Sequence, residues 1–238
     1  MAIRIAIPGE WTKRSDLVAA IRKASPGYVI AGKAIKHAES GVEQPFALED
    51  HDPNLAANFA QLRYDSGLSD AELAAINSHP KVAWLADSLG MGQAQALLRW
   101  SSPFAAAGLG VCVVSASKVH TAGAWLQLAR SVDDPEALWA AYVSLNLRPD
   151  RSAFYSSGMQ HFELPDASLP GDLDMGEAGE ILRAFNLHLL EDAPTLREGL
   201  VFQPFKEGTQ LRIVSKGASP FPAGHVQHNP YGEWVLAR

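Results

Sequence analysis

One apolar run decides how this chain is organised: LGVCVV at Leu109–Val114. Such an unbroken run of apolar and small residues is typical of a strand that is buried on both faces. The preceding residues predict a helix from about Gln93 to Ala107, and the following ones predict a helix that includes Trp125 and Leu128. We therefore expect a central strand between two helices, with Trp125 and Leu128 buried.

Before this run, the sequence predicts strands that alternate with short helices. Period-2 alternation and β-branched residues predict strands at Ile3–Ile7, Tyr28–Ala31, Gln44–Glu49 and Lys81–Ala86. Pro45 favours an edge position for the third of these strands. Side chains that cap helices predict helix starts at Ser15, at Asp52 with Pro53, and at Ser69 with Glu72.

After this run, a similar order of elements is predicted again. Asp134 with Pro135 starts a helix, and a longer helix is expected from about Gly176 to Leu190. Strands are expected at Tyr142–Leu147, Tyr155–Leu164, Leu200–Phe205 and Gln210–Val214, and around Trp234.

Each half of the chain thus reads approximately as β-α-β-β-α-β, the pattern of ferredoxin-like units. We predict an α+β fold of two fused βαββαβ halves, 1–88 and 109–216, with mixed or antiparallel sheets. A tail, 217–238, follows, and we expect the whole of 1–238 to form a single domain.

The composition favours a globular protein without nucleic acid as a partner. The apolar fraction is 47%, the charged fraction 19%, and the net charge −6. An acidic chain has no positive field to attract phosphates, so a basic protein is the partner that electrostatics favours. The N-terminus does not resemble a signal peptide, and no run reaches the roughly 18 apolar residues of a membrane span. We expect a soluble, cytoplasmic protein that does not bind membranes.

Cys112 is the single cysteine, so the chain cannot form an internal disulfide. Its aliphatic neighbours predict a buried thiol that does not react in the native state.

The candidate site is centred on Phe154–Asp166, FYSSGMQHFELPD. If this stretch is one strand, Tyr155, Met159 and His161 share its more polar face, which is suited to a cleft or a partner surface. Asp166 follows a proline, and the simplest interpretation is that it caps a turn.

His120 is the fifth candidate residue, because we predict that it opens the helix after the central strand. A neutral imidazole there could act as a base or a donor. The simpler interpretation is a histidine bonded to the Ser115–Ser117 loop. If His120 and His161 border one concavity, replacing either by alanine should change stability by less than roughly 1 kcal/mol.

Familiar cofactor and catalytic motifs cannot be read in the sequence. Gly90–Gln93 lacks the third glycine of a dinucleotide-binding loop, and no Gly-x-Ser-x-Gly motif occurs. His225 and His228 lie three apart, but no third ligand is near them in sequence. We therefore expect no metal and no cofactor, and we assign no catalytic residue.

Five separated signatures resemble one family. They are IAIPGEW at 5–11, His120 with Trp125, YSSGM at 155–159, LPD at 164–166, and NPYGEW at 229–234. Together they are similar to the bacterial family called domain of unknown function 4261. This resemblance implies one complete domain and no particular activity.

Two functional hypotheses follow from the sequence. The first is a non-catalytic protein-interaction module, such as an immunity protein that masks a toxin, since an acidic surface can steer a basic partner. The second is a small-molecule-binding protein or an enzyme that uses His120, Tyr155, His161 and Asp166, because a His–Asp pair can form a general base.

Overall fold

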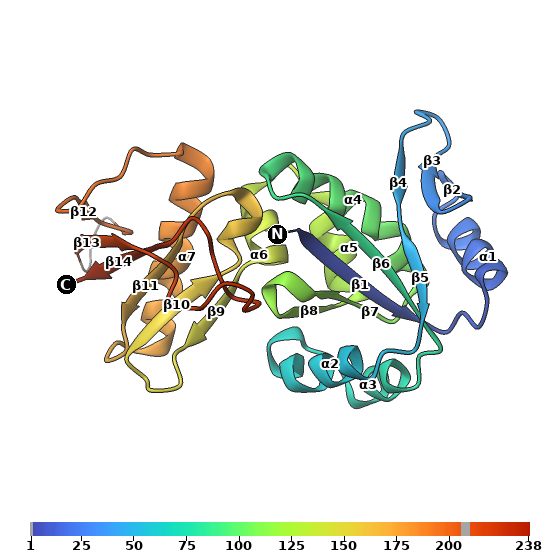
Figure 1. Cartoon of the computed structure of the whole chain (residues 1–238), viewed down its shortest axis with the longest axis horizontal. Coiled ribbons are helices and arrows are strands. Elements are labelled where there is room, and N and C mark those ends of the chain that lie inside the picture. Colours follow the sequence, from blue (N-terminus) through green and yellow to red (C-terminus); the bar gives the residue numbers. More distant parts are fainter. Residues whose placement is uncertain (1, 206–209) are drawn as a thin grey trace. The chain divides into compact units, whose positions relative to one another are not determined.

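The chain has the α+β fold that the sequence predicts. The computed structural model describes residues 2–205 and 210–238, apart from the side chains of residues 63–65 (Figure 1). It divides into two compact units, Met1–Ser88 with Gly92–Asp133 and Leu89–Met91 with Asp134–Arg238.

The first unit contains a five-stranded and a three-stranded sheet. The strand orders are β5-β6-β1-β7-β8 and β2-β3-β4, and the strand pairs are antiparallel. Its elements are β1 (Ile3–Gly9), α1 (Arg14–Ala24), β2 (Tyr28–Ala31), β3 (Ala34–His37), β4 (Glu43–Pro45), β5 (Ala47–Asp50), α2 (Pro53–Ser66), α3 (Asp70–Asn77), β6 (Lys81–Asp87), α4 (Met91–Ala107), β7 (Gly110–Val113), β8 (Lys118–Thr121) and α5 (Ala122–Arg130).

The apolar run Leu109–Val114 contains strand β7, which pairs with β1. Because these two strands share a sheet, the boundary between the units falls after Asp133 and not between the predicted halves 1–88 and 109–216. The ferredoxin-like halves are not confirmed.

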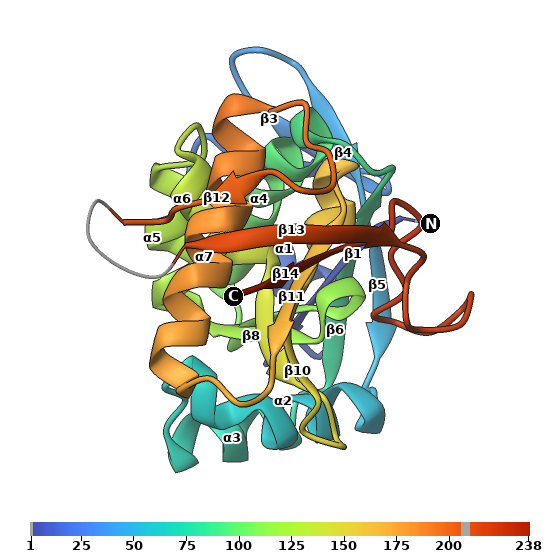
Figure 2. The same ribbon diagram turned by 90° about the vertical axis from the view of Figure 1, so that its left-hand side faces the viewer.

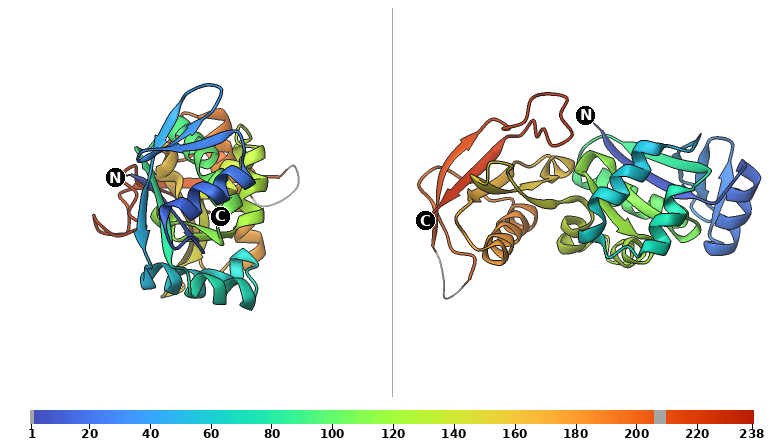
Figure 3. Two further views of the ribbon diagram at one scale, coloured as in Figure 1. Left: turned by 90° about the vertical axis from the view of Figure 1, so that its right-hand side faces the viewer. Right: turned by 90° about the horizontal axis from the view of Figure 1, so that it is seen from below.

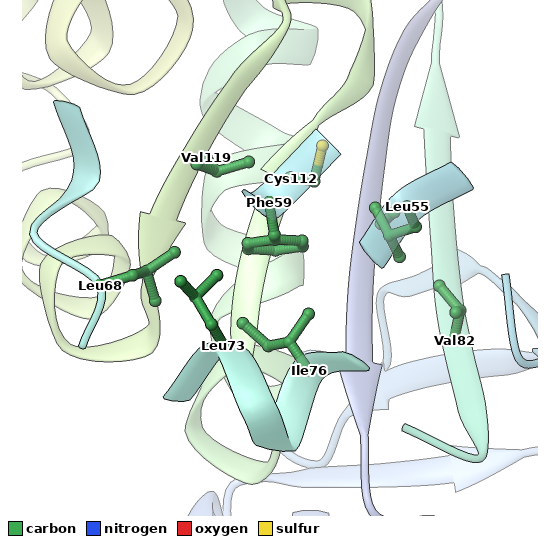
Figure 4. Packing of buried hydrophobic residues seen from close by; sticks show 9 residues of the cluster. Leu55, Phe59, Leu68, Leu73, Ile76, Val82, Cys112 and Val119 are labelled. Atoms are coloured by element: carbon green, nitrogen blue, oxygen red, sulfur yellow. The ribbon is translucent and has the colours of Figure 1, made fainter. Parts of the chain in front are cut away.

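Helices α2 and α3 cover a hydrophobic cluster of the first unit (Figure 4). Phe59 of α2 and Ile76 of α3 pack there with Cys112 of β7 and Val119 of β8. The predicted burial of Cys112 is confirmed, since the residue is 1% exposed. Burial raises the pKa of its thiol to about 12.

Helix α5 carries Trp125 and Leu128, the other two residues predicted to lie in the core. Trp125 is fully buried, as predicted, and its indole Nε1 donates to Ser101 Oγ of α4 over 2.8 Å. Leu128 is only half-buried, so its predicted burial is wrong.

The second unit contains a six-stranded sheet in the order β12-β13-β14-β11-β10-β9. β11 runs parallel to β14, while the other strand pairs of this sheet are antiparallel. The elements of this unit are α6 (Pro135–Tyr142), β9 (Ser144–Leu147), β10 (Ala153–Ser157), β11 (Asp166–Pro170), α7 (Met175–Asp192), β12 (Val201–Phe202), β13 (Leu211–Gly217) and β14 (Glu233–Ala237). Trp234 lies in the last strand, as predicted.

Helix α7 covers one face of this sheet and packs against β10 and β11 (Figure 2). The segment between β13 and β14, residues 218–232, lies on the opposite face (Figure 3), and we call it the strap. Side chains alternate along a strand, so Ala167 and Leu169 of β11 face α7 while Asp166 and Ser168 face the strap.

The predicted strand Tyr155–Leu164 is wrong beyond Ser157. Gly158 has φ +127°, and a Cβ at this position would lie 2.1 Å from the Tyr142 carbonyl oxygen. Only glycine fits this conformation and this close approach. The chain then forms a 3₁₀ helix over Met159–Phe162 before β11 begins.

The predicted strand Gln44–Glu49 is in fact two strands in two sheets. Phe46 lies between β4 and β5, is 7% exposed, and packs with its ring centroid 4.9 Å from that of Phe104. Burying Phe46 therefore turns the chain from one sheet to the other. Pro45 lies on the edge strand β4, as expected.

The helix caps predicted at Asp52, Ser69 and Asp134 are confirmed, whereas Ser15 lies inside α1, whose N-cap is Lys13. Asp52 Oδ1 accepts a hydrogen bond from the Asn54 N–H over 2.9 Å, and Asp134 caps α6 in the same way. Ser69 and Glu72 form the reciprocal capping box of α3.

Candidate functional site

Four of the five predicted site residues lie in the second unit, near the start of β11. Tyr155 is on β10, Met159 and His161 are in the 3₁₀ helix, and Asp166 is the first residue of β11. Each of them is at most 5% exposed. The predicted polar strand face is therefore wrong: the strap covers Tyr155, and the chain leaves the strand at Gly158, which turns Met159 and His161 inward.

Asp166 is the centre of this group. Its Oδ1 accepts from the Met159 N–H over 3.1 Å, and its Oδ2 accepts from Asn229 Nδ2 over 2.9 Å. Burial raises the pKa of the carboxyl to about 7, against these hydrogen bonds, and the nearby Glu233 carboxylate adds to the rise. Asp166 thus joins the 3₁₀ helix to the strap, which is more than the cap of a turn that the sequence predicts.

A second carboxylate lies beside Asp166 on the neighbouring parallel strand. Glu233 pairs with Asp166 in the register of β14 and β11. Its Oε1 accepts from Ser168 Oγ over 2.6 Å and from Arg148 Nη2 over 2.9 Å. The Arg148 guanidinium also lies 6.0 Å from the centre of the Tyr155 ring. Arg148 and Ser168 therefore supply the partners that a buried carboxylate needs.

Further contacts hold the strap to this face. Asn229 Nδ2 donates to the Leu164 carbonyl over 3.0 Å, as well as to Asp166. The Tyr155 hydroxyl donates to Gln227 Oε1 over 3.2 Å, and its ring packs 5.5 Å from that of Phe221. Strand β10 thus supplies the aromatic support and β11 the polar anchor.

His161 belongs to the core. Its side chain is fully buried, with its Nδ1 2.6 Å from the Gly158 carbonyl oxygen and its ring 5.5 Å from that of Tyr142. Burial lowers the pKa of the imidazole to about 4, so the ring is neutral at physiological pH. We therefore withdraw the prediction that His161→Ala leaves stability unchanged.

His120 is placed differently from the prediction as well. It lies in β8, paired with Val111, while Thr121 is the residue that caps α5. Its side chain is 7% exposed and its ring packs 5.2 Å from that of Trp125. His120 therefore does not face a helix N-terminus, and it belongs to the first unit.

Sequence reasoning missed Arg148, Ser168, Asn229 and Glu233. Asn229 and Glu233 lie in the NPYGEW signature, which is the one local signal that pointed to this part of the chain. The pairing of Glu233 with Asp166 requires two strands that are more than sixty residues apart to run in parallel, and no local pattern predicts such a partner.

The histidines of the strap take part in its internal packing. His225 stacks on Phe221 with ring centroids 4.8 Å apart, and His228 Nδ1 lies 2.7 Å from the Phe221 carbonyl oxygen. Over residues 2–205 and 210–238, no group of three His, Cys, Asp or Glu side chains is arranged to hold a metal ion.

The chain matches no protein-family model, no curated protein and no solved structure. The resemblance to domain of unknown function 4261 thus stays a prediction. In the part of the chain that the structure describes, no helix combines the length and the apolar character needed to cross a bilayer.

The arrangement holds a surface segment in one conformation. Asp166 and Glu233 use their carboxylate oxygens to bind the 3₁₀ helix, the strap and neighbouring side chains. Hydrogen bonds between buried polar groups hold the structure around them in one arrangement. The strap face of the second unit is therefore a pre-organised surface.

We expect Asn229→Ala to release the strap. The variant removes the amide that bonds to Asp166 and Leu164, so the free energy of unfolding should fall by about 1–3 kcal/mol. Hydrogen exchange of residues 218–232 should become faster.

Tyr155→Phe is the matched control, since it removes only the hydroxyl that bonds to Gln227 and keeps the ring on Phe221. Tyr155→Phe should lower the free energy of unfolding by only about 1 kcal/mol. Wild-type exchange of the strap in Asn229→Ala would contradict the role of Asn229.

Proposed function

We propose that this protein is a non-catalytic interaction module whose second unit binds a basic protein, as an immunity protein binds and masks a toxin. The distribution of charge supports this proposal most strongly. The second unit has 14 Asp and Glu against 8 Lys and Arg, whereas the first unit has 12 of each. The net charge of −6 therefore belongs to the second unit, and such a field accelerates encounter with a cationic partner.

The start of α7 has features of a recognition surface. Met175 is 75% exposed, and in the sequence it lies between Asp172 and Glu180, which are exposed as well. Exposed carboxylates around an apolar side chain can both steer a partner and anchor it. Asp174 has another role, since it caps α7 by accepting from the Gly176 and Glu177 N–H groups.

The test is a pull-down from a native-like lysate with wild type and two charge-reversed variants. Asp172→Lys with Glu180→Lys changes the start of α7. Glu191→Lys with Glu198→Lys makes the same change in net charge elsewhere on the second unit, again at exposed positions.

We expect wild type to retain a basic protein at equal stoichiometry. The first variant should retain it at least about tenfold less well, and the second variant should lose far less. Recovery of no stoichiometric partner, or equal losses from the two variants, would contradict the proposal.

One observation favours a second candidate, a small-molecule-binding protein or an enzyme whose site lies beneath the strap. Arg148 Nε is buried and has no hydrogen-bond partner among the described residues, and Asp166 changes its protonation state near neutral pH. A library of small anions that raises the melting temperature of wild type but not of Arg148→Met would support this candidate. Equal shifts for both proteins would exclude a site at Arg148.

A further inference from the structure

His79 connects the start of helix α2 to the end of helix α3. Helices α2 and α3 leave the first unit's sheet after β5 and return at β6. His79, which is 1% exposed, lies at the return point. Its Nε2 lies 3.2 Å from the Asp52 backbone nitrogen at the start of α2, and its Nδ1 bonds to the Ile76 carbonyl at the end of α3.

These contacts define the protonation state of the ring. A carbonyl can only accept, so Nδ1 must carry the proton, and a backbone N–H can only donate, so Nε2 must be unprotonated. Protonation would place an N–H at Nε2 against the Asp52 N–H. The bond to α2 would then be lost, and a charged ring would remain buried.

The surrounding groups oppose a charge on His79 more than they favour it. Burial lowers the pKa of the imidazole, and the His51 ring, whose centroid is 4.4 Å away, lowers it further. The hydrogen bond to the Ile76 carbonyl and the Asp52 carboxylate raise the pKa, but less than burial lowers it, and the Asp52 carboxylate is engaged in capping α2. Lys81 at the start of β6 is paired with Asp50 of β5.

We propose that His79 is a pH-sensitive switch that holds the α2–α3 pair, residues 53–77, against the first unit's core when its ring is neutral and releases it when the ring is protonated. The pair covers the cluster that contains Cys112 (Figure 4). Release therefore exposes apolar surface and a thiol that is otherwise buried.

The sign of the effect follows from linkage. A lowered folded-state pKa means that the closed form binds fewer protons than the open form, so closure is complete above pH 6.5, the ordinary histidine value. As pH falls below 6.5, the opening constant rises by up to about tenfold per pH unit until the folded-state pKa is reached.

The test measures opening of residues 53–77 in the full chain across this pH range. Hydrogen exchange is corrected for its intrinsic pH dependence and compared with that of α4 in the same samples. Access to Cys112 is followed with a dipyridyl disulfide, which still reacts with thiols in weak acid. Between pH 6.5 and about pH 5, we expect both signals to rise together, by at most about tenfold per pH unit, with α4 unchanged.

Two variants separate the switch from general acid unfolding. His79→Gln places an oxygen acceptor near Asp52 without a titrating group and should abolish the response to acid. His51→Asn removes the ring that lowers the pKa of His79, so the rise in opening should be smaller than in wild type and should level off at a higher pH. An acid response in His79→Gln equal to that of wild type would overturn the proposal. If His79→Gln does not fold, an acid response of unchanged size in His51→Asn would overturn it instead.

Discussion

Replacing Trp125 by alanine is expected to lower the free energy of unfolding by about 3–5 kcal/mol. The indole is fully buried between α5 and the sheet of the first unit, and it also bonds to Ser101. The variant loses the transfer free energy of a large aromatic group and leaves a cavity that a packed core only partly fills. Chemical denaturation followed by circular dichroism measures the effect.

Trp125→Phe and Ser101→Ala separate packing from hydrogen bonding. Phenylalanine keeps much of the apolar volume but removes the indole donor, while Ser101→Ala keeps the indole and removes the hydroxyl that accepts from it. Each should lower the free energy of unfolding by about 1–3 kcal/mol. An unchanged melting temperature for Trp125→Ala would show that α5 does not pack as described.

The second large effect is expected at His161. His161→Ala should destabilise the protein by about 2–4 kcal/mol, because it opens a cavity beside Tyr142 and removes the imidazole donor from the Gly158 carbonyl, which keeps only the His161 backbone N–H. His161→Asn is the matched control, since its side-chain amide can still donate to that carbonyl. It should lose less stability at neutral pH.

The same histidine makes stability depend on pH. Its folded-state pKa of about 4 lies below the ordinary value of 6.5, so its contribution is complete above pH 6.5 and is lost as pH falls toward about 4. The loss amounts to about 3 kcal/mol. Asp166, whose pKa is raised, acts with the opposite sign over much of this range.

Comparing wild type with His161→Asn isolates the contribution of His161 to the pH dependence of the free energy of unfolding. The gap in the free energy of unfolding between the two proteins should narrow as the solution is acidified from pH 6.5 to about 4. A constant gap would show that His161 does not titrate with a lowered pKa.

Local signals in the sequence predict local structure well. Asp52, Ser69 and Asp134 cap helices as expected, because capping needs only residues within one turn. The apolar run at β7 predicts a buried strand, and Trp234 predicts a final strand, since both follow from side chains along one segment.

Non-local contacts explain where sequence reasoning failed. The strand that begins at Ala153 ends at Gly158 because a distant backbone group, the Tyr142 carbonyl, packs against it. His120 lies in a strand because Ser117 takes the left-handed conformation, with φ 50°, and reverses the chain before β8. Asp166 finds its main partners on the strap and on β14, which the order of the sequence does not place together.

The candidate site was therefore predicted in part. Tyr155, Met159 and Asp166 lie around one polar network, as their closeness in the sequence suggests, but they are buried and support the strap. The residues that complete the network come from the turn after β9, from β11, from β14 and from the strap.

The proposed binding of a basic protein by the acidic second unit is tested most directly by its salt dependence. The purified full chain and the captured partner are mixed at increasing ionic strength, and association and dissociation rates are followed by surface plasmon resonance. We expect an association rate that falls at least about tenfold as screening increases, with little change in the dissociation rate. We also expect slower association for Asp172→Lys with Glu180→Lys. Rates that are independent of both salt and this charge reversal would contradict the proposed binding.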